Sequence, residues 1–179
     1  MSALIIGINT YASPKMQNLK GAVADAIAMK NYLENTLELP ASRIRMLTDE
    51  QATRQNIIDA LVDLERDDTI RSGDAILIYY AGHGEEVILP LGEEQKKIES
   101  VVPSDFDGEN VHVIPDYSLG QLVYRIGQKR GDNIVSRDAT RRPNTNAFIL
   151  YPRPSYSTAA TLDQEHARTT QTTSSALHI

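Results

Sequence analysis

The sequence predicts an α/β fold built on a partial, mostly parallel β-sheet. Short apolar segments alternate with longer segments of helical periodicity, in the order strand, helix, strand, helix, strand. The run from Ala75 to Tyr80 is too short for a core helix and is rich in branched and aromatic residues, as buried strands of parallel sheets are. A length of 179 residues favours a single domain.

The first three strands and two helices are predicted within the first 81 residues. Apolar runs closed by turn residues predict the strands, and apolar side chains at helical spacing predict the helices. We expect strands over residues 3–8, 44–47 and 74–81, and helices over residues 22–35 and from the N-cap Thr53 onward. Right-handed crossovers would then place these strands parallel in one sheet.

A small hairpin and a third helix are predicted next. Two short apolar pieces, residues 87–91 and 100–103, flank a polar segment and predict a hairpin beside the main sheet. The helix begins near Pro115 and ends at Lys129-Arg130-Gly131, because basic residues followed by glycine favour a helix C-terminus.

The last predicted strand is short. Ile134-Val135 begins it, but polar residues follow after two apolar ones, where about five or six residues are usual. We therefore expect the strand to stop at Val135. On this basis we divide the chain into an incomplete domain over residues 1–135 and a tail over residues 136–179. The tail is rich in Ser, Thr and Pro, so we expect it to be largely disordered, although residues 147–151 resemble a strand.

Composition excludes several classes of function. The net charge of −6, without a basic stripe, argues against nucleic-acid binding. The chain has no cysteine, which excludes disulfides and thiolate metal sites. The apolar run over residues 3–8 lacks a basic leader and is too short to span a bilayer. We expect a protein of the cytoplasm, with the nucleus also open, that binds neither nucleic acid nor membrane.

His83 is the first candidate for chemistry. It lies between Gly82 and Gly84, directly after the strand predicted over residues 74–81. Ligands of open α/β sheets bind outside the carboxyl ends of the strands. An imidazole there can act as a general base, and flanking glycines let a substrate backbone approach closely. The structural alternative is a histidine that only caps the strand.

Four motifs in order resemble a known family. They are Leu4-Ile5-Ile6-Gly7-Ile8-Asn9, Leu19-Lys20-Gly21-Ala22-Val23-Ala24-Asp25-Ala26, Tyr79-Tyr80-Ala81-Gly82-His83-Gly84 and Val102-Pro103-Ser104-Asp105. With them, residues 3–134 resemble the large-subunit region of caspase-like cysteine peptidases, most closely the fungal metacaspases. The resemblance implies a three-layer caspase-like sandwich, hydrolysis of peptide bonds in proteins or peptides, and a connection with apoptosis.

The resemblance also implies roles for single residues. His83 is the histidine of a Cys/His dyad, and Gly82 and Gly84 lie along the substrate. Asp25 helps to line a pocket for Arg or Lys before the scissile bond. Leu19 stands where caspases carry an arginine that holds an acidic residue, which favours the basic specificity. The alternative for Asp25 is stabilisation of a helix dipole in its first turn.

Calcium is a further implication, since some metacaspases bind it through acidic residues between the histidine and the third helix. Four such residues lie in that interval: Glu99, Asp105, Asp107 and Asp116. Hard cations prefer clustered carboxylate and carbonyl oxygens. The spacing matches no compact loop motif, so four solvated surface carboxylates are the alternative.

The nucleophile segment of the family is missing. In these peptidases Gly-Asp-Asn-Ile is followed by an apolar strand and an Asp-x-Cys-His-Ser-Gly segment, whereas here Gly131-Asp132-Asn133-Ile134 is followed by Val135 and polar residues. Ser136 would fall several residues short of the sheet's carboxyl end. We therefore expect an inactive family member, either a pseudo-protease or a truncated product altered after Ile134.

Two further expectations concern partners. Loss of the remaining strands would expose a sheet edge, which favours pairing with a partner chain. A hypothesis of a different class is a non-catalytic metal-binding or protein-interaction module, in which Asp49, Asp105 and Asp116 hold a metal.

Overall fold

The computed structural model describes residues 1–91, 94–138 and 148–149, and its main feature is a mixed sheet between helices. The sheet order is β2-β1-β3-β7-β8, with β8 antiparallel to β7 and the other neighbours parallel. The strands are β1 Ser2–Gly7, β2 Ile44–Thr48, β3 Ile76–Ala81, β7 Ile134–Asp138 and β8 Phe148–Ile149. The prediction of a partial, mostly parallel sheet is confirmed.

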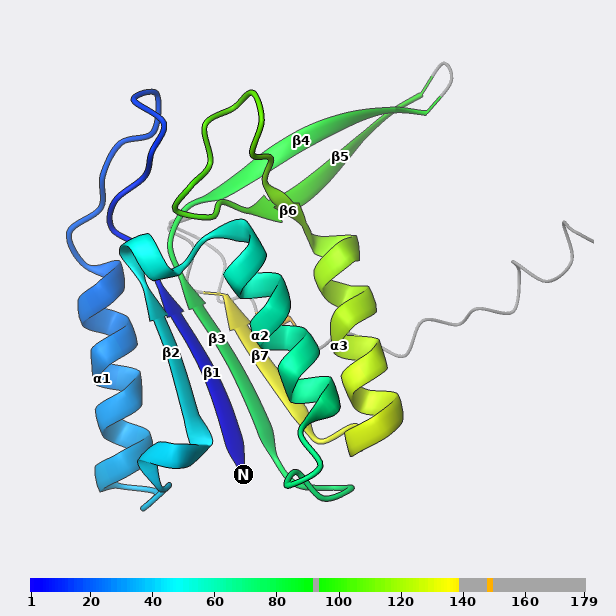
Figure 1. The fold of residues 1–179 in the computed structure, drawn as a ribbon. Helices are drawn as coiled ribbons and strands as arrows, with labels where there is room; N and C mark the ends of the chain where they lie inside the picture. Colours follow the sequence, from blue (N-terminus) through cyan, green and yellow to red (C-terminus); the bar gives the residue numbers. More distant parts are fainter. Residues whose placement is uncertain (92–93, 139–147, 150–179) are drawn as a thin grey trace, which may run out of the picture.

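Helices cover both faces of this sheet (Figure 1). Helix α1, Ala22–Asn35, packs on one face, and α2, Arg54–Arg66, and α3, Asp116–Arg130, pack on the other. Thr53 caps α2 as predicted, since its side-chain oxygen accepts the N–H of Asn56 at 3.2 Å. In the described ranges no helix is long and apolar enough to cross a membrane.

Strand β1, between β2 and β3, is buried along its whole length. Leu4 and Ile6 pack in the layer toward α2 and α3, while Ala3 and Ile5 pack in the layer toward α1. A strand that is covered on both faces has a continuous run of apolar residues, and this run is why the sequence predicted β1.

Gly7 allows α1 to lie directly on the end of β1. A Cβ atom at Gly7 would lie 2.6 Å from Cβ of Ala26 and 3.0 Å from the main-chain oxygen of Ala22. The glycine therefore brings the first turns of α1, and the loop that precedes them, over the carboxyl end of the sheet.

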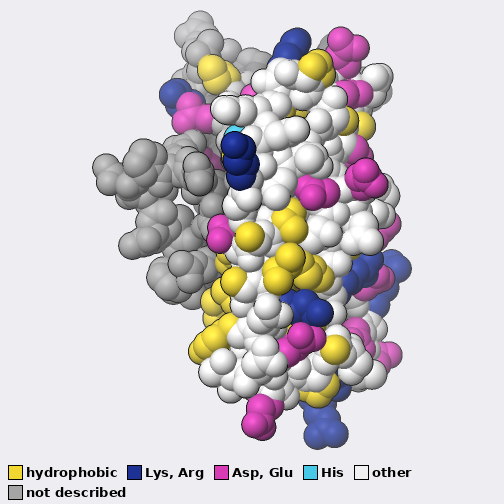
Figure 2. All heavy atoms as spheres, turned by 90° about the vertical axis from the view of Figure 1, so that its left-hand side faces the viewer, with side chains coloured by type: hydrophobic (Ala, Val, Ile, Leu, Met, Phe, Trp, Pro, Cys, Tyr) yellow, Lys and Arg dark blue, Asp and Glu magenta, His cyan; other side chains and the backbone are white. Residues whose placement is uncertain are grey.

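The outer side of the molecule at α1 mixes apolar and charged side chains. Figure 2 looks onto this side and shows hydrophobic side chains gathered in the middle, with acidic and basic side chains around them. On α1 itself, Ile27 and Tyr32 are 46% and 52% exposed. Charges of both signs are dispersed over this side, without a basic stripe of the kind that nucleic-acid binding uses.

A β-hairpin projects from the body after His83 (Figure 1). It consists of β4, Gly84–Leu91, and β5, Glu94–Val101, and the short strand β6, Ile114–Pro115, adds to β5. The predicted hairpin is confirmed, but both strands are longer than the apolar pieces. Part of the polar segment expected between the strands belongs to β5, because its backbone pairs with β4 whatever the polarity of its side chains.

Strand β7 is longer than predicted. It continues to Asp138, which lies beside Tyr80 of β3, so the prediction that it stops at Val135 is wrong. Parallel pairing with β3 supplies main-chain hydrogen bonds whatever the polarity of Ser136 and the residues after it. Of the predicted tail, residues 136–138 thus belong to β7 and 148–149 form β8, and the rest lies outside the described residues.

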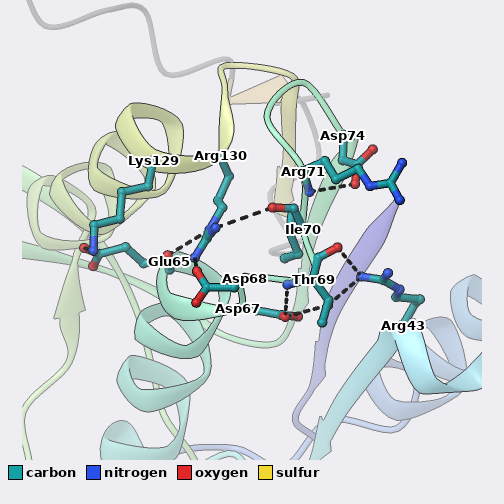
Figure 3. Close-up of polar contacts among 10 residues, drawn as sticks. All are labelled: Arg43, Glu65, Asp67, Asp68, Thr69, Ile70, Arg71, Asp74, Lys129 and Arg130. Atoms are coloured by element: carbon teal, nitrogen blue, oxygen red, sulfur yellow. Dashed lines mark hydrogen bonds and ion pairs between the residues drawn. The ribbon is translucent and has the colours of Figure 1, made fainter.

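At the opposite end of the sheet from His83, side chains fasten the end of α3 to the end of α2 (Figure 3). The Arg130 guanidinium, only 12% exposed, donates to the main-chain oxygen of Glu65 at 3.0 Å and to the Asp68 carboxylate at 2.8 Å. The buried Glu65 carboxylate lies 2.6 Å from the guanidinium of Arg125 and 3.4 Å from the ammonium of Lys129. These contacts fix how the two helices cross the sheet.

Candidate active site

His83 lies at the carboxyl edge of the sheet, two residues after the end of β3. Its side chain is partly exposed, and Gly84, the next residue, opens the hairpin. The loop between β1 and α1 reaches the same edge, so residues distant in sequence surround the imidazole. The predicted position of the histidine at a strand exit is thus confirmed.

The His83 ring is held in one tautomer by the main chain. Nε2 lies 2.6 Å from the carbonyl oxygen of Gln17. Because a carbonyl only accepts, Nε2 must carry the proton, and in the neutral ring Nδ1 is left with its lone pair. Nδ1 is therefore the atom that can act as a base.

The main chain of His83 is held by two tyrosines. Its N–H donates to the Tyr11 hydroxyl at 2.8 Å, and its carbonyl oxygen lies 2.8 Å from the Tyr80 hydroxyl. The Tyr80 hydroxyl also lies 2.9 Å from the carbonyl oxygen of Val102. The rings of Tyr11 and His83 meet with centroids 5.0 Å apart at a tilt of 48°. Sequence reasoning missed Tyr11, since only the fold brings it to His83.

Packing inside the protein requires glycine at position 82. A Cβ atom there would lie 2.5 Å from the Tyr80 hydroxyl oxygen and 3.1 Å from that of Tyr11. The missing side chain makes room for both hydroxyls, whereas Gly84 is exposed at the start of β4. Contact of either glycine with a substrate stays a prediction.

Burial raises the pKa of Tyr11 to about 12, which keeps its hydroxyl neutral. We expect phenolate absorbance to show one step near pH 12 that Tyr11→Phe removes. Because the pKa of Tyr11 is higher in the folded protein than in the unfolded chain, the folded state is favoured by keeping the hydroxyl protonated. This stabilisation is present below about pH 10 and is lost as the pH rises toward about 12. If wild type and Tyr11→Phe gave the same absorbance titration above about pH 11, this expectation would be contradicted.

Asp49 anchors the loop that carries Tyr11 and Gln17. Its carboxylate accepts the N–H of Asn9 at 2.7 Å and that of Thr10 at 2.9 Å. The Asn9 side chain in turn accepts the N–H of Val23 at 3.3 Å, in the first turn of α1. Asp49 thus acts through hydrogen bonds on the loop, which is a structural use of a carboxylate considered above as a metal ligand.

The other acidic candidates do not form a metal-holding group. In the part of the chain that the structure describes, no three His, Asp or Glu side chains are grouped so that they could hold an ion. Asp105 accepts the N–H of Arg54 at the start of α2, at 2.8 Å. Asp107 accepts three main-chain N–H groups, which lower the pKa of its carboxyl far below the usual value. Glu99 lies on β5, and Asp116 begins α3.

Asp25 lies in the first turn of α1 and is exposed. The N-terminus of α1 is near the carboxyl edge of the sheet, because Val23 bonds to Asn9 just beyond β1. Asp25 thus lies in an exposed helix turn near this edge, and contact of its carboxylate with a ligand stays a prediction.

The strand next to His83 carries no thiol. Ser136 of β7 lies beside Ile78, five residues before His83 in the numbering of β3, so it does fall short of the histidine. Strand β7 ends at Asp138, beside Tyr80, and residues 139–147 after it lie outside the described residues. The sequence contains no cysteine at any position.

A profile of the caspase domain family, Peptidase C14, matches residues 1–126. The chain belongs to the caspase-domain family. It is 34% identical over 133 residues to metacaspase-1 of Debaryomyces hansenii and 35% identical over 141 residues to metacaspase-6 of Arabidopsis thaliana. The resemblance that the motifs indicated is confirmed.

The match covers only part of these relatives. It takes in 70% and 75% of this caspase-domain chain, but 29% and 36% of the two metacaspases. A crystal structure of protein GSU0716 from Geobacter sulfurreducens superimposes with a TM-score of 0.59 at 22% identity, covering 76% of this chain and 48% of that one. At that identity the likeness shows the fold, and it confirms the predicted caspase-like α/β class.

Proposed function

We propose that this caspase-domain protein binds peptides without cleaving them, as a pseudo-protease of the cysteine endopeptidase family. The observation that carries the proposal is the combination of an oriented His83, with Nδ1 left as the base, and a sequence without any thiol. Covalent peptide hydrolysis by a Cys/His dyad needs the thiolate as nucleophile, and the imidazole alone cannot replace it.

The proposed ligand is an extended peptide with Arg or Lys at the position that Asp25 would face. The exposed carboxylate in the first turn of α1 supplies the opposite charge at the carboxyl edge of the sheet. Leu19 supplies no charge that would hold an acidic residue. The partners are thus proteins or peptides with a basic residue in an extended segment.

Fluorogenic peptides with Arg or Lys before the reporter test both parts of the proposal. We expect no release of the fluorophore, but binding in a fluorescence polarisation assay. Asp25→Asn should weaken that binding by about fivefold, which is the upper value for an exposed ion pair. The matched control is Asp59→Asn, on the exposed side of α2, which should leave the affinity unchanged.

Two outcomes would contradict the proposal. Cleavage that His83→Ala abolishes would show that the chain is an active peptidase. Equal binding of Asp-containing and Arg-containing peptides would show that Asp25 does not select a basic residue.

A further inference from the structure

We propose that Tyr11 and Tyr80 are positioning residues that hold His83 by its main chain and so fix the direction of Nδ1. The inference rests on the proposed assignment of His83 as the histidine of the family's Cys/His dyad, which this chain keeps although it has no thiol. It concerns how the imidazole is oriented, and it does not depend on which peptide is bound.

The two hydroxyls converge on His83 from different elements. Tyr80 belongs to β3 and is 5% exposed, whereas Tyr11 comes from the loop after β1, 72 residues away from His83 in sequence. The Tyr11 hydroxyl accepts the N–H of His83, and the Tyr80 hydroxyl donates to the His83 carbonyl oxygen. Gly82 leaves the space in which both oxygens lie.

The Tyr11 hydroxyl has both of its hydrogen-bonding functions in use. It accepts from the N–H of His83 at 2.8 Å and donates to the carbonyl oxygen of Ile8 at 3.3 Å. A phenylalanine at this position would fill the same space, but it would leave the His83 N–H without its acceptor. The hydroxyl, and not only the ring, is therefore what the geometry requires.

These side-chain contacts restrain the histidine together with the N–H of Val102, which donates to the His83 carbonyl oxygen at 3.0 Å. The tyrosines fix its main chain, and the Gln17 carbonyl fixes Nε2. The same loop supplies Tyr11 and Gln17, so a change at Tyr11 also acts on the acceptor of Nε2. A base held in this way keeps one tautomer and one direction, which is the preorganisation that proton transfer uses.

Nitrogen NMR of the His83 ring in the full chain tests the proposal. In wild type we expect the proton on Nε2. Tyr11→Phe should lower the ratio of the Nε2–H to the Nδ1–H tautomer by about fivefold, the equivalent of one typical hydrogen bond. Tyr32→Phe, on the exposed side of α1, is the matched control and should leave the ratio unchanged. An unchanged ratio in a folded Tyr11→Phe protein would overturn the proposal.

Hydrogen exchange in the wild-type protein gives a second measurement that needs no variant. The His83 amide should exchange slowly because Tyr11 accepts it, and exchange at the rate of an unprotected amide would overturn the proposal. Both readouts are independent of peptide binding. Failure of the fluorogenic assay would therefore contradict the proposed function and leave the positioning of His83 to be decided by NMR.

Discussion

Replacement of Gly7 by alanine is expected to lower the free energy of unfolding by about 3 kcal/mol, the upper range for forcing a methyl group into a packed site. The new Cβ would lie 2.6 Å from Cβ of Ala26 and 3.2 Å from Cα of Val23. Neither atom is the end of a flexible side chain, so α1 must move away from β1. Urea unfolding followed by circular dichroism measures the loss.

Gly21→Ala is the matched control for this change. Gly21 precedes α1, its backbone has a negative φ, and a Cβ atom there would contact nothing within 4 Å. We expect its free energy of unfolding to change by less than about 1 kcal/mol, and a small gain is reasonable because alanine restricts the unfolded chain. Equal urea midpoints for the two variants would show that α1 does not need the close approach at Gly7.

The fold was predictable where local signals and burial agree. The helices from residue 22 and from Thr53 begin where the sequence indicates, because apolar periodicity and, for α2, the Thr53 cap are local signals. The extent of β7 and of the hairpin was not, because pairing with a neighbouring strand stabilises polar residues as well as apolar ones. Predicting strand ends from side-chain polarity therefore made β7 and the hairpin strands too short.

The position of His83 in the candidate site was predictable from the sequence. His83 follows a buried strand and sits between glycines, which a single segment of sequence reveals. Tyr11 and Gln17 contact His83 from the loop after β1, and Asp49 bonds the main chain of that loop; no local pattern indicates such contacts. A carboxylate that bonds a main-chain N–H group, as Asp105 does, has the same sequence signal as a possible cation ligand.

Replacement of Arg130 by alanine is expected to cost about 3 kcal/mol of folding free energy, because hydrogen bonds of a charged group are lost and buried carbonyl groups are left without a donor. The guanidinium bonds the main-chain oxygen of Glu65 and the carboxylate of Asp68, and its own exposure is low. The sequence indicated only that a basic residue at this helix end favours the dipole, an effect of about 0.3–1 kcal/mol. Urea unfolding distinguishes the two magnitudes.

Lys30→Ala provides the comparison with an ordinary surface ion pair. Lys30 pairs with Glu34 one turn later in α1, at 3.5 Å, and such pairs contribute about 0.2–0.5 kcal/mol. Raising the salt concentration should weaken the Lys30 contribution, whereas most of the Arg130 contribution should remain, because its bond to the Glu65 carbonyl does not depend on a second exposed charge. If Arg130→Ala costs no more than Lys30→Ala, the dipole alone accounts for Arg130, and its contacts with α2 do not stabilise the packing of α3 on the sheet.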